Sequence, residues 1–389
     1  MVNNQFMTTK VFSNIFRLFL IAICIVLYSC SGKSHFAIDT KEIDFVNKTD
    51  MYLEGNYTGI EAFGINRMLV KDTFLICITN DPSGMVKVYS TETLKPIISL
   101  CMQGRAKNEF SKSVYDVNGQ AYYKNNDLIL PLHDDMNYQL KEVNISKSIR
   151  EGSTQVESVS KSNTIIEADF VLLDNDINNR FEHIDALRDE VDDTKLYPAQ
   201  FRIIDADYNI KDKIIVHPSL MDSEDGKSQE SMYWGSLYKH PNKNLVLFSY
   251  DYMNYLLFFN MDTHKYYAIH QEGSMTFDDV APIVPEDGSI YCFSFGAVSK
   301  DYIFIRYKAG DYAINSPDKE SPLSELLVFD WDGNYLGGAK FKMPLARIAY
   351  NEKDSVLYGS DYNEKILSFD LRNLINACQT ETSYLKNNE

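Results

Sequence analysis

Short apolar runs alternate with polar turns along most of the chain after residue 40, and four pairs of runs share one spacing. In each pair, the first strand-like run ends just before an aspartate, and eight residues after that aspartate lies the anchor residue of the second run. The four pairs are Asp81 and Tyr89, Asp135 and Val143, Asp251 and Phe259, and Asp361 and Phe369. A recurrence of this kind indicates stacked copies of one supersecondary unit.

Two further runs fit the same unit through anchors at Ile204 and Phe329, so six units are visible. The anchors lie 40 to 70 residues apart, which brackets the roughly 40–50 residues of one four-stranded propeller blade plus loop insertions. The pattern therefore predicts an all-β, six-bladed β-propeller. A pair of smaller β-sandwiches is the alternative architecture, but it does not predict the same spacing in segments so far apart.

A propeller ring must close, and the last unit ends near Leu371 without a clear outer strand. We expect residues 37–45 to supply that strand by pairing with the final blade. Helical periodicity is weak, with short helical turns predicted only at 185–191 and 371–377. Residues 152–164, 221–231 and 311–324 interrupt the rhythm. The first is predicted to be a loop or a polar edge, and the other two to be exposed insertions, where a propeller usually carries its binding surface.

The N-terminus has the pattern of an export signal. Lys10 and Arg17 precede the apolar run 18–27, which is too short to span a bilayer as a mature helix. The run ends in Leu27-Tyr28-Ser29-Cys30, which resembles the lipobox of bacterial lipoproteins, and an ordinary secretory signal or an uncleaved anchor is the alternative. The domains expected are a signal peptide at 1–29, a lipidated tether at 30–38, the propeller at 39–375 and a C-terminal tail at 376–389.

Charge and cysteine usage narrow the function. The formal net charge is −17, and removal of Lys10 and Arg17 with the signal peptide makes the mature chain more acidic still. Nucleic acid is excluded as an expected partner, because binding it needs a basic stripe that neutralises phosphate. No Cys-x-x-Cys pair or metal-ligand cluster appears, so no metal or other cofactor is expected. A Cys77–Cys101 bridge stays open, because nothing in the spacing demands it.

The most distinctive loop is 103–110, Gln-Gly-Arg-Ala-Lys-Asn-Glu-Phe, which leads into the second unit. It resembles the glycine-rich Gly-Arg-Gly-Pro-Asn-Glu-Phe-like segment of the TolB-like six-bladed propeller lipoproteins of Bacteroidetes, a family largely without assigned function. The match keeps Gly104, Arg105, Asn108, Glu109 and Phe110, whereas Ala106 and Lys107 replace the Gly-Pro turn. The resemblance extends over the lipobox and most of the mature chain, and it implies a propeller anchored through several acyl chains on Cys30.

Two interpretations are open for the polar residues singled out. Arg105, Asn108 and Glu109 form a candidate ligand-binding set facing the central channel, or Arg105 and Glu109 pair with each other or with neighbouring blades. The repeated aspartates could ring one face and bind a cation or sugar hydroxyls. Their repetition in equivalent positions favours turns in which they accept backbone N–H bonds.

No catalytic residues are identified, because the histidines share no register and no Gly-x-Ser-x-Gly elbow or phosphate-binding loop occurs. We therefore expect a monomeric binding module for an envelope protein or a small ligand such as a glycan. It would be held to a membrane through Cys30, facing the periplasm, since no acidic run follows Cys30. The alternatives are a propeller enzyme, such as a lyase or a glycan-acting protein, and a carbohydrate-binding accessory lipoprotein.

Overall fold

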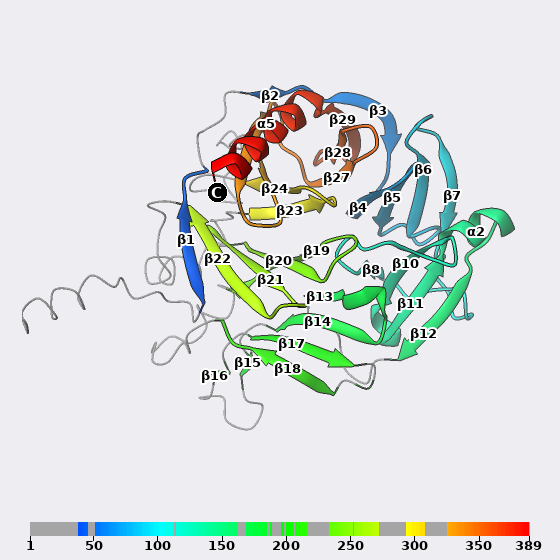
Figure 1. Ribbon diagram of the computed structural model, residues 1–389. Helices are drawn as coiled ribbons and strands as arrows, with labels where there is room; N and C mark the ends of the chain where they lie inside the picture. The colour runs from blue at the N-terminus through cyan, green and yellow to red at the C-terminus, as the bar shows by residue number, and fades with distance from the viewer. Residues whose placement is uncertain are drawn as a thin grey trace, which may run out of the picture.

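The computed structural model describes residues 38–45, 51–112, 114–161, 169–184, 187–188, 196–197, 200–205, 207, 209–216, 233–251, 253–271, 293–307 and 325–388. The signal peptide, Cys30 and the predicted insertions at 221–231 and 311–324 lie outside these residues. Six sheets of four or five strands are arranged around a common centre (Figure 1), and a separate pair of short strands lies beside the third. The chain is a six-bladed β-propeller, as predicted.

The first three blades follow one another along the chain. Blade 1 consists of β4 (Ile65–Lys71), β5 (Phe74–Thr79), β6 (Val86–Ser90) and β7 (Pro96–Leu100). Blade 2 consists of β8 (Val114–Asp116), β9 (Tyr122–Lys124), β10 (Asp127–Asp134), β11 (Gln139–Asn144) and β12 (Val156–Lys161), with η1 (Asp135–Asn137) and α2 (Ile145–Glu151). Blade 3 consists of β13 (Asp169–Leu172), β14 (Asn179–Ile184), β17 (Gln200–Asp205) and β18 (Ile210–Ile214), with η2 (Leu173–Asn175) and the small pair β15 (Leu187–Arg188) and β16 (Leu196–Tyr197).

The last three blades each receive their outermost strand from the N-terminal segment, as a fifth strand in blades 4 and 5 and as the fourth in blade 6. Blade 4 consists of β19 (Gly235–Lys239), β20 (Leu245–Tyr250), β21 (Tyr255–Asn260), β22 (Lys265–Gln271) and β1 (Asp39–Ile43). Blade 5 consists of β23 (Phe293–Val298), β24 (Ile303–Tyr307), β25 (Glu325–Phe329), β26 (Tyr335–Phe341) and β2 (Tyr52–Leu53). Blade 6 consists of β27 (Arg347–Asn351), β28 (Val356–Ser360), β29 (Lys365–Asp370) and β3 (Asn56–Glu61).

The predicted closure of the ring is wrong in its choice of strand. β3 closes blade 6 by pairing antiparallel with β29, whereas residues 39–43 form β1 and pair in parallel with β22 of blade 4. The Thr58 hydroxyl donates to the Ile366 carbonyl at 2.7 Å, and the Gly64 N–H donates to the Glu364 carboxylate at 2.7 Å. We call residues 39–61 the N-terminal strap, because its strands are the outermost ones of three successive blades.

Buried side chains of the described residues gather in six clusters, each of which lies between two neighbouring blades. The six anchor residues all lie in the third strand of their blades, where one face of the sheet packs on the next blade. Phe45, at the end of the strap's first strand, packs against Phe293, Tyr307 and Phe329 with ring centroids 5.6 to 6.0 Å apart. The apolar pattern that marks the strands therefore reports contacts between blades.

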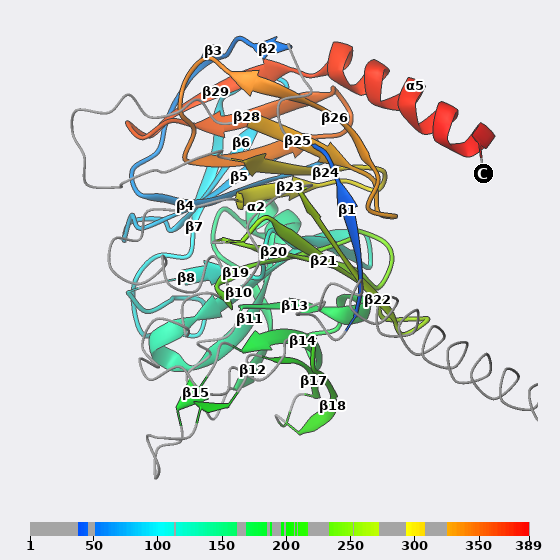
Figure 2. The ribbon, with the colours of Figure 1, turned by 90° about the vertical axis from the view of Figure 1, so that its left-hand side faces the viewer.

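Helical structure differs from the expectation at both predicted positions. The described residues of 185–191 form β15, not a helical turn. The turn expected at 371–377 is the start of α5 (Arg372–Asn388), a helix of 17 residues that packs on β26 (Figure 2). Leu371, Leu374, Ile375 and Cys378 are buried at its base, with the spacing of one helix face. The segment expected to be a tail therefore continues this helix.

Candidate functional site

Two of the repeated aspartates accept backbone N–H groups in the turns between the second and third strands of their blades. Asp81 Oδ1 accepts from the Ser83 N–H at 3.0 Å, and its Oδ2 pairs with Lys87 Nζ at 2.6 Å. Asp361 Oδ1 accepts from the N–H groups of Asn363 and Lys365, both at 2.8 Å. These bonds hold tight turns between antiparallel strands.

The other two repeated aspartates occupy the equivalent place with different local structure. Asp135 begins the short helix η1 between β10 and β11. The Asp251 N–H donates to the Trp234 carbonyl at 2.8 Å, just after β20. All four aspartates thus mark one end of the channel, which we call the aspartate end.

The loop 103–110 also lies at the aspartate end and is closed on itself by Glu109. Glu109 Oε2 accepts the Ala106 N–H at 2.8 Å, and a Cβ on Gly104 would come within 1.9 Å of that oxygen. Arg105 is exposed and forms no ion pair with Glu109, whose carboxylate is bonded to the Ala106 N–H, so the alternative in which these two residues pair with each other is not found. Asn108 is half-buried.

Backbone contacts fasten this loop to the first two blades. The Gln103 N–H donates to the Pro82 carbonyl at 3.0 Å in blade 1. Lys141 of blade 2 donates through Nζ to the Glu109 carbonyl at 2.7 Å, and its ammonium lies 4.3 Å from the ring centre of the buried Phe110. The loop residues do not line either of the channel cavities described next.

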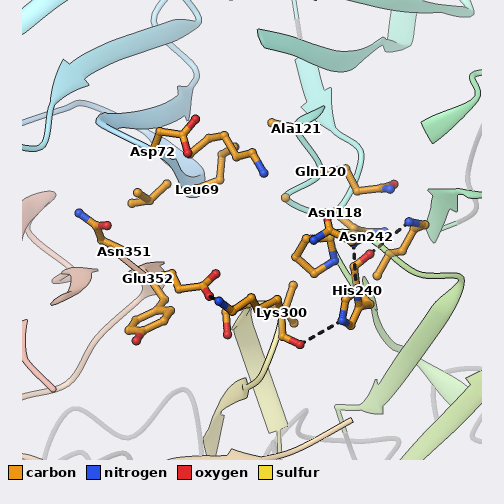
Figure 3. Close-up of a pocket in the computed structure, with 18 of the residues that line it drawn as sticks. Leu69, Asp72, Asn118, Gln120, Ala121, His240, Asn242, Lys300, Asn351 and Glu352 are labelled. Atoms are coloured by element: carbon orange, nitrogen blue, oxygen red, sulfur yellow. Dashed lines mark hydrogen bonds and ion pairs between the residues drawn. The ribbon is translucent and has the colours of Figure 1, made fainter. Parts of the chain in front are cut away.

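A cavity of about 200 Å³ opens at the other end of the channel, where the first and second strands of each blade are joined. We call this cavity the funnel; Figure 3 shows the side chains that line it. All six blades contribute to it, through residues 69–72, 118–121, 175, 239–242, 298–300 and 350–353. It is the place where the described parts of the six blades enclose a shared space.

Asn118 and Gln120 line the funnel but are occupied in joining blade 2 to blade 3. The Gln120 amide donates to the Leu172 carbonyl at 3.0 Å and accepts the Leu172 N–H at 2.6 Å. Asn118 Nδ2 donates to the Phe170 carbonyl at 2.7 Å. Both amides are buried, so these bonds satisfy polar groups that would otherwise be costly to desolvate.

His240 has both ring nitrogens engaged. Nδ1 accepts the backbone N–H groups of Asn242 and Lys243 at 2.9 and 3.0 Å, so the proton resides on Nε2, which donates to the Lys300 carbonyl at 3.0 Å. Burial lowers the pKa of His240, and the Trp331 ring packs 5.0 Å from it. His240 therefore joins blades 4 and 5 as a neutral imidazole.

Lys239 differs from the other lysines of the funnel because its side chain is buried. Its residue is 4% exposed, and its Nζ donates to the His240 carbonyl at 3.1 Å. Burial lowers the pKa of Lys239, and the more distant carboxylates of Asp174 and Asp262 oppose this shift. A buried ammonium without a carboxylate at ion-pair distance is an uncommon arrangement in proteins.

The rim of the funnel carries exposed ion pairs. Lys300 Nζ lies 3.3 Å from Glu352 Oε1, and Lys353 Nζ lies 3.3 Å from Glu92 Oε1. The Tyr123 hydroxyl donates to Asp72 on the blade 1 side. Exposed pairs of this kind contribute little to stability, so these side chains can exchange partners.

Deeper in the channel, a second cavity of about 50 Å³ is lined mostly by apolar residues, with Arg67, Asn118 and Tyr238 among the others. Arg67 Nε lies 3.3 Å from Asp116 Oδ1, and its Nη2 donates to Asn118 at 3.2 Å. Burial and the nearby guanidinium groups of Arg67 and Arg306 lower the pKa of Arg347 to about 10. The channel therefore narrows to a belt of polar groups toward the aspartate end.

Asp169 is the titratable group of this belt whose ionisation should matter for stability. Burial raises the pKa of Asp169 to about 6, although its Oδ2 accepts the Leu237 N–H at 2.6 Å. A raised carboxyl pKa means that the folded protein holds a proton that the unfolded chain releases. The stabilising contribution is complete below about pH 4 and is lost as the pH rises through 6.

We expect Asp169→Asn to remove this pH dependence. Between pH 4 and 7, the free energy of unfolding of the wild type should fall relative to that of the variant by up to about 3 kcal/mol, from the two-unit shift. Urea unfolding of both proteins at several pH values measures the difference. A difference that stays constant from pH 4 to 7 would contradict the raised pKa.

Within the described residues, no three His, Cys, Asp or Glu side chains lie close enough together to hold a metal ion. Cys77, Cys101 and Cys378 are free and buried. None of the described helices is both long and apolar enough to cross a membrane. The funnel residues were not identified from the sequence, because each blade supplies only one to four of them. Their shared position, between the first and second strands, is the signal that could have found them.

No family model and no curated protein matches this chain. Similar solved structures include a Bacteroides fragilis protein inferred to be exported, with 9% identity over 85% of this chain and 98% of its own, at a TM-score of 0.48. A Bacteroides vulgatus member of the DUF4221 family has 13% identity over 82% and 97%, at 0.46. The WD40 domain of Neurospora crassa Pan2 has 10% identity over 79% and 76%, at 0.40. These likenesses assign neither a family nor a function to the chain.

Proposed function

We propose that this protein is a ligand-binding module of the bacterial cell envelope, anchored by lipid on Cys30 and facing the periplasm, with its ligand site in the funnel. The observation that carries the proposal is a polar cavity to which all six blades contribute. A volume of about 200 Å³ is small beside the roughly 300–1,000 Å³ of pockets for drug-sized ligands, so the expected ligand is about the size of one sugar.

The binding-module interpretation is favoured over the enzyme interpretation by the state of His240. Both of its nitrogens are used in contacts between blades, so it is not available as a general base. The carboxylates at the rim, Asp72 and Glu352, already have partners in Tyr123 and Lys300. Such side chains suit recognition of hydroxyl groups better than proton transfer.

A partner protein is proposed to dock at the aspartate end. Arg105 is exposed there, on a loop that is held in place by backbone bonds to both neighbouring blades. A preorganised loop with an exposed guanidinium group is suited to binding a carboxylate of a protein partner. The two ends of the channel would then serve different ligands, a small molecule at the funnel and a protein at the loop.

Obstruction of the funnel tests the proposal. The mature chain from Ser31, without lipid, is screened by saturation-transfer NMR against neutral and acidic monosaccharides. Asn242→Trp places a bulky ring at an exposed funnel position, and Lys243→Trp is the matched control, because the neighbouring Lys243 does not line the cavity. We expect at least one sugar to bind the wild type and Lys243→Trp, and to lose binding in Asn242→Trp. Equal binding by both variants, or no binding by the wild type, would refute the funnel as the site.

A further inference from the structure

Lysines outnumber carboxylates among the residues that line the funnel, although the chain as a whole has a formal net charge of −17. Four lysines and two carboxylates line this cavity. They are Lys71, Lys239, Lys300 and Lys353, and Asp72 and Glu352. Lys300 and Lys353 are paired with carboxylates at the rim, so Lys71 and Lys239 supply the positive charge that the cavity can offer to an anionic ligand.

The four lysines are not equivalent. Lys300 and Lys353 are more than half exposed and are paired with Glu352 and Glu92 at 3.3 Å each. Lys71 is half-buried, with its ammonium 5.9 Å from the centre of the Tyr123 ring. Lys239 alone is nearly fully buried.

The Lys239 ammonium has more donors than the described residues satisfy. It carries three N–H groups, and its hydrogen bond to the His240 carbonyl uses one of them. No described carboxylate lies within 4.0 Å of it, since Asp174 and Asp262 act on it only at longer range. Burying a charge without a partner is costly, so an anion bound in the funnel would supply what this ammonium lacks.

Two amides that line the funnel with Lys239 are also available for a ligand. Asn175, in blade 3, is half-buried. Asn242, in blade 4, is exposed at the funnel (Figure 3). Neither side-chain amide is hydrogen-bonded to another described residue, in contrast to Asn118 and Gln120. An amide both donates and accepts, which is the chemistry that recognises hydroxyl groups.

We infer that the funnel binds a monosaccharide-sized sugar acid, whose carboxylate is held by Lys239 and whose hydroxyl groups are held by Asn175 and Asn242. This inference rests on the proposed function and names the class of its ligand. A neutral sugar would leave the Lys239 ammonium unpaired, and a simple inorganic anion would leave the two amides unused.

Calorimetric titration of the mature chain with glucuronate, glucose and inorganic phosphate tests the inference. We expect glucuronate to bind at least about 10-fold more tightly than glucose or phosphate, the factor expected for one hydrogen-bonded charge pair. Raising the salt concentration should weaken glucuronate binding and leave glucose binding unchanged. Equal affinities for glucuronate and glucose, or an affinity for phosphate as high as that for glucuronate, would overturn the inference.

Substitution of the buried lysine separates its role from that of the rim. Lys239→Met keeps the apolar chain and removes the charge, so we expect about 10-fold weaker glucuronate binding with an unfolding temperature no lower than that of the wild type. Lys300→Met is the matched control and should weaken binding about 2-fold at most. Glucuronate binding unchanged in Lys239→Met would refute the assignment, and if that variant does not fold, Lys239→Gln replaces it.

The same titrations distinguish failure of this inference from failure of the proposed function. If glucose binds as tightly as glucuronate and Asn242→Trp abolishes the binding of both sugars, the funnel remains a ligand site, but the sugar-acid assignment is wrong. If glucuronate binds and Asn242→Trp leaves its affinity unchanged, both the assignment and the funnel site fall.

Discussion

A chain that begins at Ala62 should lose its cooperative fold, whereas a chain that begins at Met51 should keep it. The two differ only in the stretch that contains β2 and β3 of the N-terminal strap. Without β3, blade 6 lacks its outer strand and the ring no longer closes. We expect the chain from Ala62 to be less stable than the chain from Met51 by on the order of 5 kcal/mol or more.

This magnitude follows from what the missing residues bury and bond. Ile60 is 3% exposed and packs in the cluster between blades 6 and 1, and Leu53 is 5% exposed against blade 5. Full burial of each such side chain contributes about 1.5–3 kcal/mol. The backbone pairing of β3 with β29 and the Thr58 hydroxyl bond to the Ile366 carbonyl contribute about 0.5–1.5 kcal/mol for each hydrogen bond.

Thermal unfolding and hydrogen exchange measure the effect. The amides of residues 365–368 should exchange rapidly in the chain from Ala62 and stay protected in the chain from Met51. The chain from Met51 also serves as the control for β1, which it lacks together with Phe45. Matching unfolding temperatures and matching protection in the two chains would show that β3 is not what closes the ring.

Lys141→Met should destabilise the protein by about 3–5 kcal/mol at neutral pH, because it leaves a buried carboxylate without its cation. Lys141 Nζ lies 2.7 Å from Asp134 Oδ2, and the two side chains are 4% and 0% exposed. The same ammonium donates to the Glu109 carbonyl, so the loop 103–110 should also become more mobile. Urea unfolding measures the stability, and hydrogen exchange at 103–110 measures the loop.

The pH dependence of this loss has a defined sign. Burial raises the pKa of Asp134, but hydrogen bonds from Lys141, Ser111 and Asn137 outweigh it and hold the pKa below its ordinary value. The stabilisation is therefore present above about pH 4 and is lost as the pH falls further. The difference between wild type and Lys141→Met should narrow in acid.

Two controls distinguish loss of the buried pair from loss of any lysine. Lys353→Met removes an exposed pair with Glu92 and should cost less than about 1 kcal/mol. The double variant with Asp134→Asn and Lys141→Met should be more stable than Lys141→Met alone, because no unpaired charge remains. A double variant as unstable as Lys141→Met would attribute the loss to packing against Phe110 instead.

The repeat was readable from the sequence because the third strands are largely buried, most completely in blades 4 and 5. Phe259 and Phe329 are 1% and 0% exposed, and the residues before them in each strand form a continuous apolar run. Outer strands carry no such signal. Asn56–Glu61 buries only Ile60 fully, and Gly59 lies within it, so its composition does not indicate a strand. Closure was predicted for residues 37–45 instead, of which 39–43 pair with β22 of blade 4.

The predicted helical turn at 371–377 is shorter than α5, although the start of α5 has the apolar spacing of a helix. Leu371, Leu374, Ile375 and Cys378 follow the spacing of one helix face, but beyond them polar residues dominate. The helix is held by its contact with β26. A local sequence pattern does not reveal packing partners that are distant in the sequence.

The candidate site was less predictable than the fold. The contiguous polar residues of loop 103–110 favoured a ligand site, yet the Glu109 carboxylate accepts a hydrogen bond within the loop itself. The funnel gathers Asp72, His240 and Glu352 from hairpins that are separated by more than a hundred residues. Residues so far apart in the sequence come together only when the ring closes.

The N-terminal strap also sets the order in which the chain can fold. Residues 39–61 leave the ribosome early, but their partners β22, β26 and β29 follow more than 200 residues later. Pairings between strands so distant in sequence form slowly, because the chain loses entropy when the long loop closes, before the stabilising contacts form. Blades 4, 5 and 6 therefore emerge with open outer edges, and the newly synthesised chain is most exposed to aggregation until the N-terminal strap pairs with them.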